Sequence, residues 1–321
     1  MRVMKTVTSE HSRRRWRESG SGEVKDSGRE GLRGHVISAV DDPIENYVLG
    51  NSEQEQERLK LQGSFLEPWT EQFLLSAGLE PGMRVLDLGC GMGDVSLLAA
   101  RLVGASGHVT AIDRDSVIIE KARQRSRDEE LGPNIEFIRS ELLDFQAERS
   151  FDAVVGRYVL FFQADPVAAI SHAAKQVRPE GIIVFHEMDL ANRIRSYPDA
   201  TLFERMVDLI AETDRRGGVS VDLGSHLTHL FLDAGLPWPT IKAEVPIGGA
   251  PGSFVYRWAA ETLRSLLPRI EQFGLASADE LDLDTLVARM EAEAVTLRTQ
   301  LIGPLQFGAW TRKLSSVLCR G

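Results

Sequence analysis

The stretch that decides the fold spans residues 85–94 and reads Val85-Leu86-Asp87-Leu88-Gly89-Cys90-Gly91-Met92-Gly93-Asp94. It combines a short apolar strand, a turn with three glycines at alternate positions, and the start of a helix. Glycine leaves room where a backbone must turn sharply and come close to a ligand. The first helical turn then presents free backbone N–H groups to that ligand. The stretch therefore predicts a ligand site at the carboxyl end of a strand.

An acidic residue distinguishes this turn from a dinucleotide-binding turn. A dinucleotide fingerprint reads G-x-G-x-x-G directly after the strand, whereas the order here is D-x-G-x-G-x-G. Asp87 lies two positions before the first glycine, where it would oppose a pyrophosphate. It would favour a cationic ligand, such as a sulfonium that carries an amino acid. This is a physical reason to prefer S-adenosylmethionine over NAD.

Outward from this turn, short apolar strands alternate with helices. Strands are predicted at residues 84–88, 107–112, 135–139, 151–156 and 182–186, and helices at residues 94–102, 116–127 and 166–177. Such an alternation indicates a parallel sheet that is buried on both faces. Further helices are predicted at residues 202–215, 223–234, 253–273 and 284–301, and further strands at 241–246 and 307–311. Upstream, residues 41–78 have a helical pattern, and Pro68 is expected to restart the helix.

Five motifs in this order resemble those of the class I S-adenosylmethionine-dependent methyltransferases. They are the glycine turn, the strands Val109–Asp113, Ile135–Glu141 and Ser150–Arg157, and the turn Val177–Gly181. The resemblance covers residues 85–189 and implies an α/β fold, a Rossmann-like doubly wound seven-stranded sheet with an antiparallel last strand. Glu180 replaces the first glycine of the family pattern L-x-P-G-G. Since that position often needs a positive φ, a different turn is expected there. A Rossmann fold that binds another nucleotide is the alternative.

The resemblance also implies which residues hold the cofactor. Asp113 would accept hydrogen bonds from the ribose hydroxyls, and Glu141 would face the adenine amino group. Arg157 would bind the carboxylate of the methionine moiety or a substrate anion, unless it pairs with a nearby carboxylate. The expected cofactor-binding residues are Tyr47, Gln62, Asp87, Gly89, Gly91, Asp113, Arg114, Glu141, Leu142 and Arg157.

Tyr47 and Gln62 enter this set through a second, weaker resemblance. Their segment is similar to the N-terminal helices that close over the cofactor in a bacterial subgroup of these enzymes. A helix that packs on the sheet with a solvated, Glu-rich face explains the same residues equally well.

Two residues at the end of the fifth predicted strand are candidates for catalysis. Ligands of such sheets bind at the carboxyl ends of the strands, where His186 and Glu187 are expected. Methyl transfer to oxygen or nitrogen needs a general base or only alignment of the nucleophile. The ordinary pKa of histidine lies near neutrality, and a glutamate could do the same work or orient the substrate. Because strand residues alternate faces, one of the two side chains is expected to point away from the site.

The sequence divides into three expected regions. Residues 1–36 are rich in Arg, Ser, Gly and Glu and are predicted to be disordered. Residues 37–80 are predicted to form an N-terminal helical cap, and residues 81–321 the methyltransferase core. Two lid insertions are expected in the core, at about residues 190–220 and 253–300, and the second is far longer than a hairpin connection requires. The second carries several aromatic residues, most of them expected in helix contacts and a few around an apolar pocket.

The composition restricts the classes of partner that the protein is expected to bind. The formal net charge of −10 argues against a broad nucleic-acid surface. No apolar run is long enough for a transmembrane helix, so no membrane partner is expected. The two cysteines and the pair His226 and His229 form no metal-type spacing, so no metal is expected and a cytoplasmic location is the default. The oligomeric state stays open, with a homo-oligomer among the options.

The predicted function is methyl transfer from S-adenosylmethionine to a small, apolar, secondary-metabolite acceptor, with S-adenosylhomocysteine as the product. The alternatives are a protein or RNA methyltransferase and a non-catalytic protein that binds S-adenosylmethionine. The acidic charge and the aromatic lid argue against the first of these alternatives.

Overall fold

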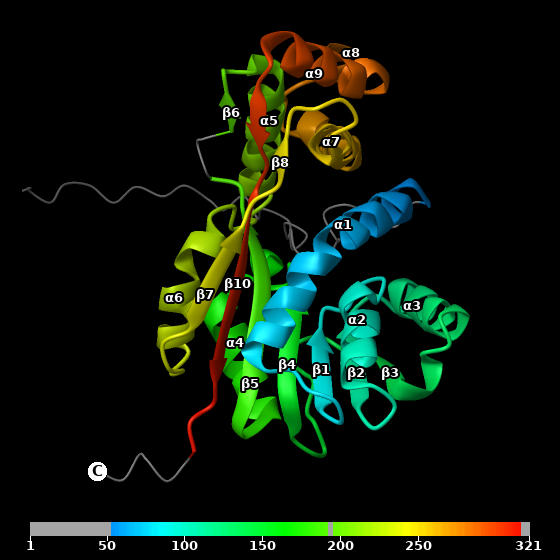
Figure 1. Ribbon diagram of the computed structural model, residues 1–321, viewed down its shortest axis with the longest axis vertical. Coiled ribbons are helices and arrows are strands. Elements are labelled where there is room, and N and C mark those ends of the chain that lie inside the picture. Colours follow the sequence, from blue (N-terminus) through cyan, green and yellow to red (C-terminus); the bar gives the residue numbers. More distant parts are fainter. Residues whose placement is uncertain (1–52, 192–194, 316–321) are drawn as a thin grey trace, which may run out of the picture. The chain divides into compact units, whose positions relative to one another are not determined.

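A computed structural model of the protein describes residues 53–191 and 195–315. The predictions for residues 1–36, for the first part of the helical cap and for Tyr47 lie outside the described residues. Element labels follow Figure 1.

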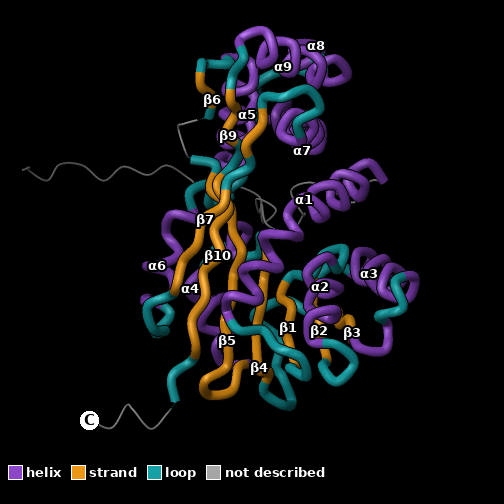
Figure 2. Tube along the Cα trace, in the orientation of Figure 1, coloured by secondary structure: helices purple, strands orange, loops and turns teal. Residues whose placement is uncertain are grey.

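The described residues are built around a mixed seven-stranded sheet (Figures 1 and 2). Its strands are β1 (Arg84–Leu88), β2 (His108–Asp113), β3 (Ile135–Arg139), β4 (Phe151–Arg157), β5 (Val177–Asp189), β7 (Thr240–Glu244) and β10 (Leu305–Arg312). Their order is β3-β2-β1-β4-β5-β10-β7. The first five strands run parallel, and β10 is antiparallel to both of its neighbours. This confirms the predicted Rossmann-like sheet and its antiparallel last strand.

Helices cover both faces of the sheet. One face carries α1 (Glu53–Ala77), α2 (Asp94–Val103) and α3 (Ser116–Asp128). The other carries α4 (Pro166–Gln176) and α6 (Leu223–Asp233). Two short 3-10 helices, η1 (Gly132–Asn134) and η2 (Leu160–Phe162), follow α3 and β4. Burial of apolar strand residues on both faces explains why β1 and β4 are apolar along almost their whole length.

Helix α1 is a single helix that runs through Pro68, so the predicted restart at this proline is wrong. Leu66, Thr70 and Phe73 are buried on both sides of the proline. A Cβ on Gly308 of β10 would lie 2.3 Å from the Phe73 ring, which shows how closely α1 approaches the sheet. Tertiary packing thus offsets the helical hydrogen bond that proline cannot make.

The two segments predicted as insertions fold next to each other. The first contains β6 (Ser196–Tyr197) and α5 (Thr201–Arg216), and the second contains α7 (Phe254–Gln272), α8 (Ala278–Leu281) and α9 (Leu283–Leu297). Helix α5 packs against α7 and α9, and the apolar core of the sheet continues into these helices. We call α5, α7, α8 and α9 the helical layer; it lies beyond the carboxyl ends of the parallel strands (Figure 1).

The predicted helix 284–301 is wrong at its end. Helix α9 ends at Leu297, Arg298 adopts a left-handed φ of +54°, and the chain enters strand β9 (Gln300–Ile302). This strand joins β6 and β8 (Ile247–Gly248) in a three-stranded sheet with the order β6-β9-β8. Strands of two or three residues are too short to leave a periodic pattern, so the sequence did not predict this sheet.

The expectation of an altered turn at Glu180 is also wrong. Glu180 adopts a φ of +60°, the conformation that the family pattern gives to glycine. Its N–H donates to the Lys313 carbonyl at 2.9 Å, and Arg312 Nη1 donates to the Glu180 carbonyl at 3.0 Å. These bonds with the last residue of β10 and the residue after it hold a glutamate in a backbone region that favours glycine.

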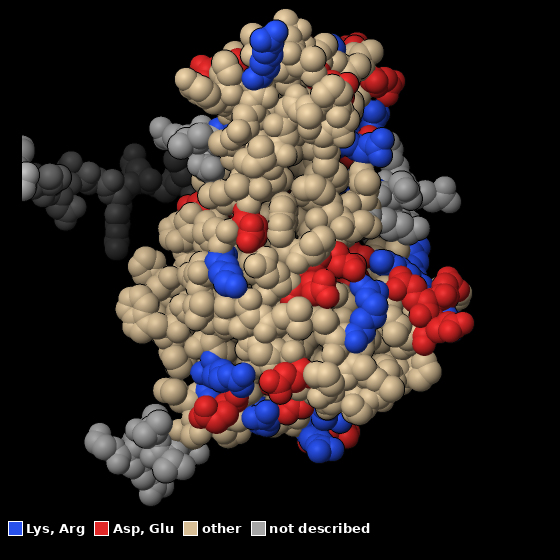
Figure 3. All heavy atoms as spheres, in the orientation of Figure 1, with Lys and Arg blue, Asp and Glu red and all other residues tan. Residues whose placement is uncertain are grey.

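Charged side chains are unevenly distributed over the face drawn in Figure 3. Basic and acidic residues lie close together toward the lower and right-hand edges of that view, and much of the middle carries neither. Among the described residues, none of the helices combines the length and apolarity that crossing a membrane requires.

Candidate functional site

A cavity of about 1080 Å³ opens at the carboxyl ends of the parallel strands. The sheet supplies one part of its lining, from the turns that follow β1, β2, β3 and β4. Helix α1 and the helical layer supply the rest. From the predicted cofactor set, the lining includes Gln62, Asp87, Gly89, Gly91, Asp113, Arg114, Glu141, Leu142 and Arg157. The structure thus brings together all the predicted cofactor residues that it describes.

The glycine turn forms one wall of the cavity. Gly89 and Gly91 adopt left-handed φ values of +60° and +51°, which side chains other than glycine rarely take. A Cβ on Gly89 would lie 2.5 Å from Cγ2 of Val159, so this glycine allows β1 and the β4 turn to approach. A Cβ on Gly91 would have no described atom within 4 Å, because the position faces open space. A ligand could therefore lie directly against the backbone at Gly91.

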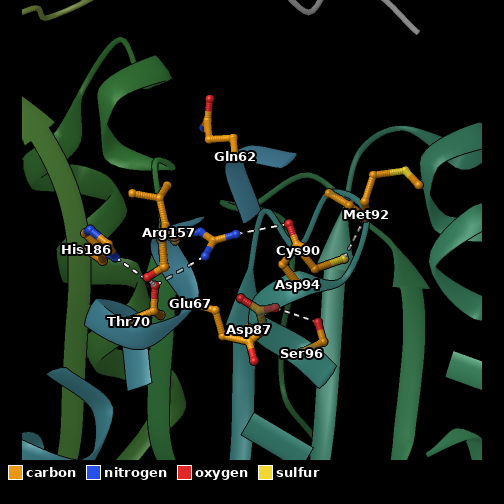
Figure 4. Close-up of polar contacts among 12 residues, drawn as sticks. Gln62, Glu67, Thr70, Asp87, Cys90, Met92, Asp94, Ser96, Arg157 and His186 are labelled. Carbon is orange, nitrogen blue, oxygen red and sulfur yellow. Dashed lines mark hydrogen bonds and ion pairs between the residues drawn. The ribbon is translucent and has the colours of Figure 1, made fainter. Parts of the chain in front are cut away.

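Asp87, at the end of β1, is almost fully buried. Ser96 Oγ of α2 donates a hydrogen bond to Asp87 Oδ2 at 2.5 Å (Figure 4). Burial raises the pKa of this carboxyl to about 7, against the opposing effect of the Ser96 hydrogen bond. Such a shift shows that the negative charge of Asp87 is poorly compensated, and a cationic ligand in the cavity would stabilise it.

Asp113, at the end of β2, holds the glycine turn in place. Its Oδ2 accepts a hydrogen bond from the Gly91 N–H at 2.9 Å, and its Oδ1 accepts one from the Asp115 N–H at 3.0 Å. Burial is the main cause that raises the pKa of the Asp113 carboxyl. The same carboxylate thus links β2 to the turn after β1 and faces the cavity.

Arg157, at the end of β4, is engaged by neighbouring side chains (Figure 4). Its Nη2 lies 3.0 Å from Oδ2 of Asp94, and its Nη1 donates to Thr70 Oγ1 at 3.2 Å. Asp94 begins α2 and also pairs with Arg125 of α3. Of the two predicted roles for Arg157, the structure shows the pairing with a nearby carboxylate.

His186 is buried on the α1 side of β5 and does not line the cavity. Its Nδ1 lies 3.0 Å from Thr70 Oγ1, and its Nε2 lies 3.1 Å from Oε1 of Gln306. Gln306 Nε2 donates to the Pro304 carbonyl, which turns its Oε1 toward His186. Burial lowers the pKa of His186 to about 3, so the ring is neutral near pH 7.

Glu187 is fully buried and does not line the cavity either. Its Oε1 accepts hydrogen bonds from the N–H groups of Val159 and Leu160 at 3.0 and 2.9 Å. Its Oε2 accepts one from the Phe161 N–H at 3.3 Å. Burial nevertheless raises the pKa of Glu187 to about 8. The side chain fixes the chain between β4 and η2, and that chain lines the cavity.

Neither candidate for catalysis therefore faces the cavity. The expected alternation of faces holds, since His186 contacts α1 and Glu187 contacts the η2 segment. A catalytic role for either residue stays a prediction that this placement does not favour. A role in positioning the β4 turn suits Glu187 better.

The sequence did not single out the polar residues of the helical layer. Asp214 of α5 and Thr262 of α7 line the cavity, together with Ile210, Val219, Trp258 and Leu266. The signal was present, because Trp258, Thr262 and Leu266 are four residues apart and share one helix face. Thr70 and Gln306, which hold His186, were also missed. Among the described residues, no group of three or more His, Cys, Asp or Glu side chains could hold a metal ion.

The comparisons with known proteins concern the sheet and its motifs. The model of a methyltransferase domain family matches residues 79–225. An uncharacterized 37.1 kDa transposon protein from Streptomyces fradiae is 33% identical over 171 residues, which are 52% of this chain and 46% of that protein. The 2-phytyl-1,4-naphtoquinone methyltransferase of Nostoc is 32% identical over 122 residues, which are 37% of this chain and 53% of that protein. The chain thus spans about half the length of these curated relatives.

A solved structure agrees on the fold. A Bacillus halodurans protein assigned as a methyltransferase superposes with a TM-score of 0.51 at 13% identity, covering 77% of this chain and 99% of that one. The family match and the five ordered motifs fall on the same strands and turns, and they lead to one assignment. Residues 79–225 therefore form a methyltransferase domain, and its motifs resemble those of the class I S-adenosylmethionine-dependent methyltransferases.

Proposed function

We propose that the protein transfers a methyl group from S-adenosylmethionine to a small, largely apolar acceptor bound between the sheet and the helical layer. The observation that carries this proposal is that one cavity joins the glycine turn to the apolar face of α7. When bound, S-adenosylmethionine supplies an electrophilic methyl group, the acceptor gives up a proton, and S-adenosylhomocysteine is the product.

The cofactor end of the cavity fits this donor. Open space at Gly91 admits a ligand against the backbone. Asp113 and Glu141 line the positions at which we expect the ribose and the adenine. Asp87, whose charge is poorly compensated, would face the cationic methionine moiety. Arg114, Leu142 and Gln62 complete the expected cofactor contacts.

The size of the cavity supports a second ligand beside the cofactor. Pockets for single small molecules measure roughly 300–1000 Å³, and this cavity measures about 1080 Å³. Its wall toward the helical layer is mostly apolar, which suits an apolar acceptor. The naphtoquinone named for the Nostoc relative belongs to the same chemical class. We extend the proposal to a secondary metabolite of this class.

The test has two stages. Calorimetric titration of the full chain with S-adenosylmethionine and S-adenosylhomocysteine is expected to show saturable binding, with NADH and flavin as controls. Incubation with S-adenosylmethionine and a panel of naphthols, hydroquinones and aliphatic alcohols is then expected to release S-adenosylhomocysteine with the aromatic members. Binding of NADH or flavin without the sulfur nucleosides would contradict the proposal. Binding without turnover across the panel would favour the non-catalytic alternative.

A further inference from the structure

Two polar residues of the helical layer line the cavity and have no side-chain hydrogen bond with another described residue. Asp214 of α5 has a relative exposure of 7%, and the structure gives its carboxylate no hydrogen bond or ion pair with another described residue. Thr262 of α7 is 8% exposed, and its Oγ1 has no hydrogen-bond partner among the described residues. Leaving a buried polar group without a partner costs about 1–3 kcal/mol. Both residues line the cavity, but Thr262 Oγ1 is itself inaccessible, so a ligand in the cavity could satisfy only the Asp214 carboxylate.

Helix geometry places these groups beside an aromatic surface. Trp258, Thr262 and Leu266 are four residues apart on α7, so all three lie on the face that lines the cavity. Ile210 and Asp214 have the same spacing on α5, which packs against α7. The resulting surface is apolar and partly aromatic, and it contains one carboxylate.

The charges around Asp214 restrict what this surface can bind. Burial raises the pKa of its carboxyl to about 7, and Arg269 and Arg58 oppose that shift. Arg58 of α1 also lines the cavity. A cationic acceptor would meet these two arginines, whereas a neutral hydroxyl or N–H donor would satisfy the carboxylate without repulsion.

We propose that Asp214 and Trp258 form the acceptor-binding end of the cavity, and that they select a neutral aromatic acceptor carrying a hydroxyl or N–H donor. This inference rests on the proposed function, because it assigns the acceptor of that reaction. Trp258 contacts the aromatic body, and Asp214 accepts the hydrogen bond of the donor group.

The test uses two probes with the same aromatic body. 2-Naphthol carries a hydroxyl donor, whereas 2-methoxynaphthalene carries none. Their dissociation constants for the full chain are measured by ligand-observed NMR, with and without S-adenosylhomocysteine. The wild-type protein is expected to bind 2-naphthol about tenfold more tightly, which is the effect of one hydrogen bond to a charged acceptor.

Variants separate the contributions of the residues. Asp214→Leu is expected to reduce the preference to less than about twofold, whereas Thr262→Val removes a hydroxyl that a ligand cannot reach and is expected to leave the preference unchanged. Trp258→Leu is expected to weaken both probes by a similar factor and leave their ratio unchanged. Glu212→Gln, on the exposed side of the same helix α5, is the matched control and is expected to change neither constant.

Several outcomes would overturn the inference. They are equal binding of both probes to the wild-type protein, no binding of either probe, and an unchanged preference in Asp214→Leu. If Asp214→Leu does not fold, Asp214→Asn keeps the shape of the side chain and must lower the preference at least about threefold. A probe preference that depends on Asp214, in a protein that binds no S-adenosylhomocysteine, would contradict the proposed function but still support the aromatic binding site.

Discussion

Polar side chains at the sheet end of the cavity make hydrogen bonds or ion pairs within the protein, whereas a carboxylate at the helical-layer end does not. At the sheet end, Asp113 accepts two backbone N–H groups, Glu187 accepts three, and Arg157 pairs with Asp94. At the helical-layer end, Asp214 lines the cavity and makes no side-chain hydrogen bond with another described residue. The first arrangement holds a framework in one geometry whether or not a ligand is bound. The second leaves hydrogen-bonding capacity for a ligand to use, which is where selectivity is expected.

Removing Glu187 should produce the largest loss of stability, because it belongs to the framework. Glu187→Leu leaves three buried N–H groups without an acceptor, so we expect the free energy of unfolding to fall by about 3–5 kcal/mol. Urea denaturation measures this loss. Glu136→Leu, at an exposed position of β3, is the control and should change stability by less than about 1 kcal/mol. A stable Glu187→Leu protein that has lost turnover would instead support the predicted catalytic role.

Asp113 and Trp258 test whether the two ends bind different ligands. Asp113→Ala removes the carboxylate expected at the ribose, so affinity for S-adenosylhomocysteine should fall about ten- to a hundredfold. Trp258→Leu should change that affinity by less than about threefold. Calorimetry measures both, and thermal melting shows whether each variant is folded. Equal losses in the two variants would mean that the cofactor and acceptor ends are not separate.

The same contrast explains how much of the fold and the site the sequence alone could predict. The strands β1 and β3 match their predicted bounds, and β2 and β4 differ by about one residue, because each is a short apolar run bounded by turn residues. The site at their ends followed from the glycine turn and from Asp113, since backbone and acid contacts need particular residues at fixed spacings.

The helical layer could be predicted only as helices. Amphipathic spacing indicates that Trp258 and Asp214 lie on helices, but which face meets the cavity depends on how α5 packs against α7, a contact between distant segments. His186 and Glu187 were chosen because they end a strand, yet their neighbours Thr70 and Val159 come from other elements. Tertiary contacts of this kind leave no local pattern in the sequence.

The pH dependence of stability should reveal the poorly compensated charge of Asp214. Its folded pKa of about 7 lies above the ordinary value of 3.8, so between these values the unfolded chain has lost a proton that the native protein keeps. The group therefore destabilises the native protein increasingly as the pH rises from about 4 to 7. Asp214→Asn removes this effect, so its stability relative to wild type should rise by about 1–3 kcal/mol over that window.

The comparison with wild type is necessary because Asp87 and Glu187 also have raised pKa values and contribute with the same sign. Glu212→Gln provides a control of opposite sign. Hydrogen bonds from Arg216 and Arg215 lower the pKa of Glu212. Glu212 therefore stabilises the wild type increasingly as the pH rises toward 4.5, the ordinary pKa of glutamate. Over that pH range, Glu212→Gln should lose stability relative to the wild type. An Asp214→Asn difference that stays flat from pH 4 to 7 would show that a partner already compensates this carboxylate.

The smallest predicted effect concerns backbone strain at two positions with a left-handed φ. The cofactor turn has a glycine, Gly91, at a φ of +51°, whereas Arg298, directly after α9, has a φ of +54°. The Arg298 side chain is exposed, so Arg298→Gly should stabilise the protein by up to about 1 kcal/mol in urea denaturation. Gly91→Ala should do the reverse, because its Cβ meets no described atom within 4 Å and only the backbone cost remains. A loss of stability in Arg298→Gly would mean that the arginine side chain itself stabilises the end of α9 by more than its backbone conformation costs.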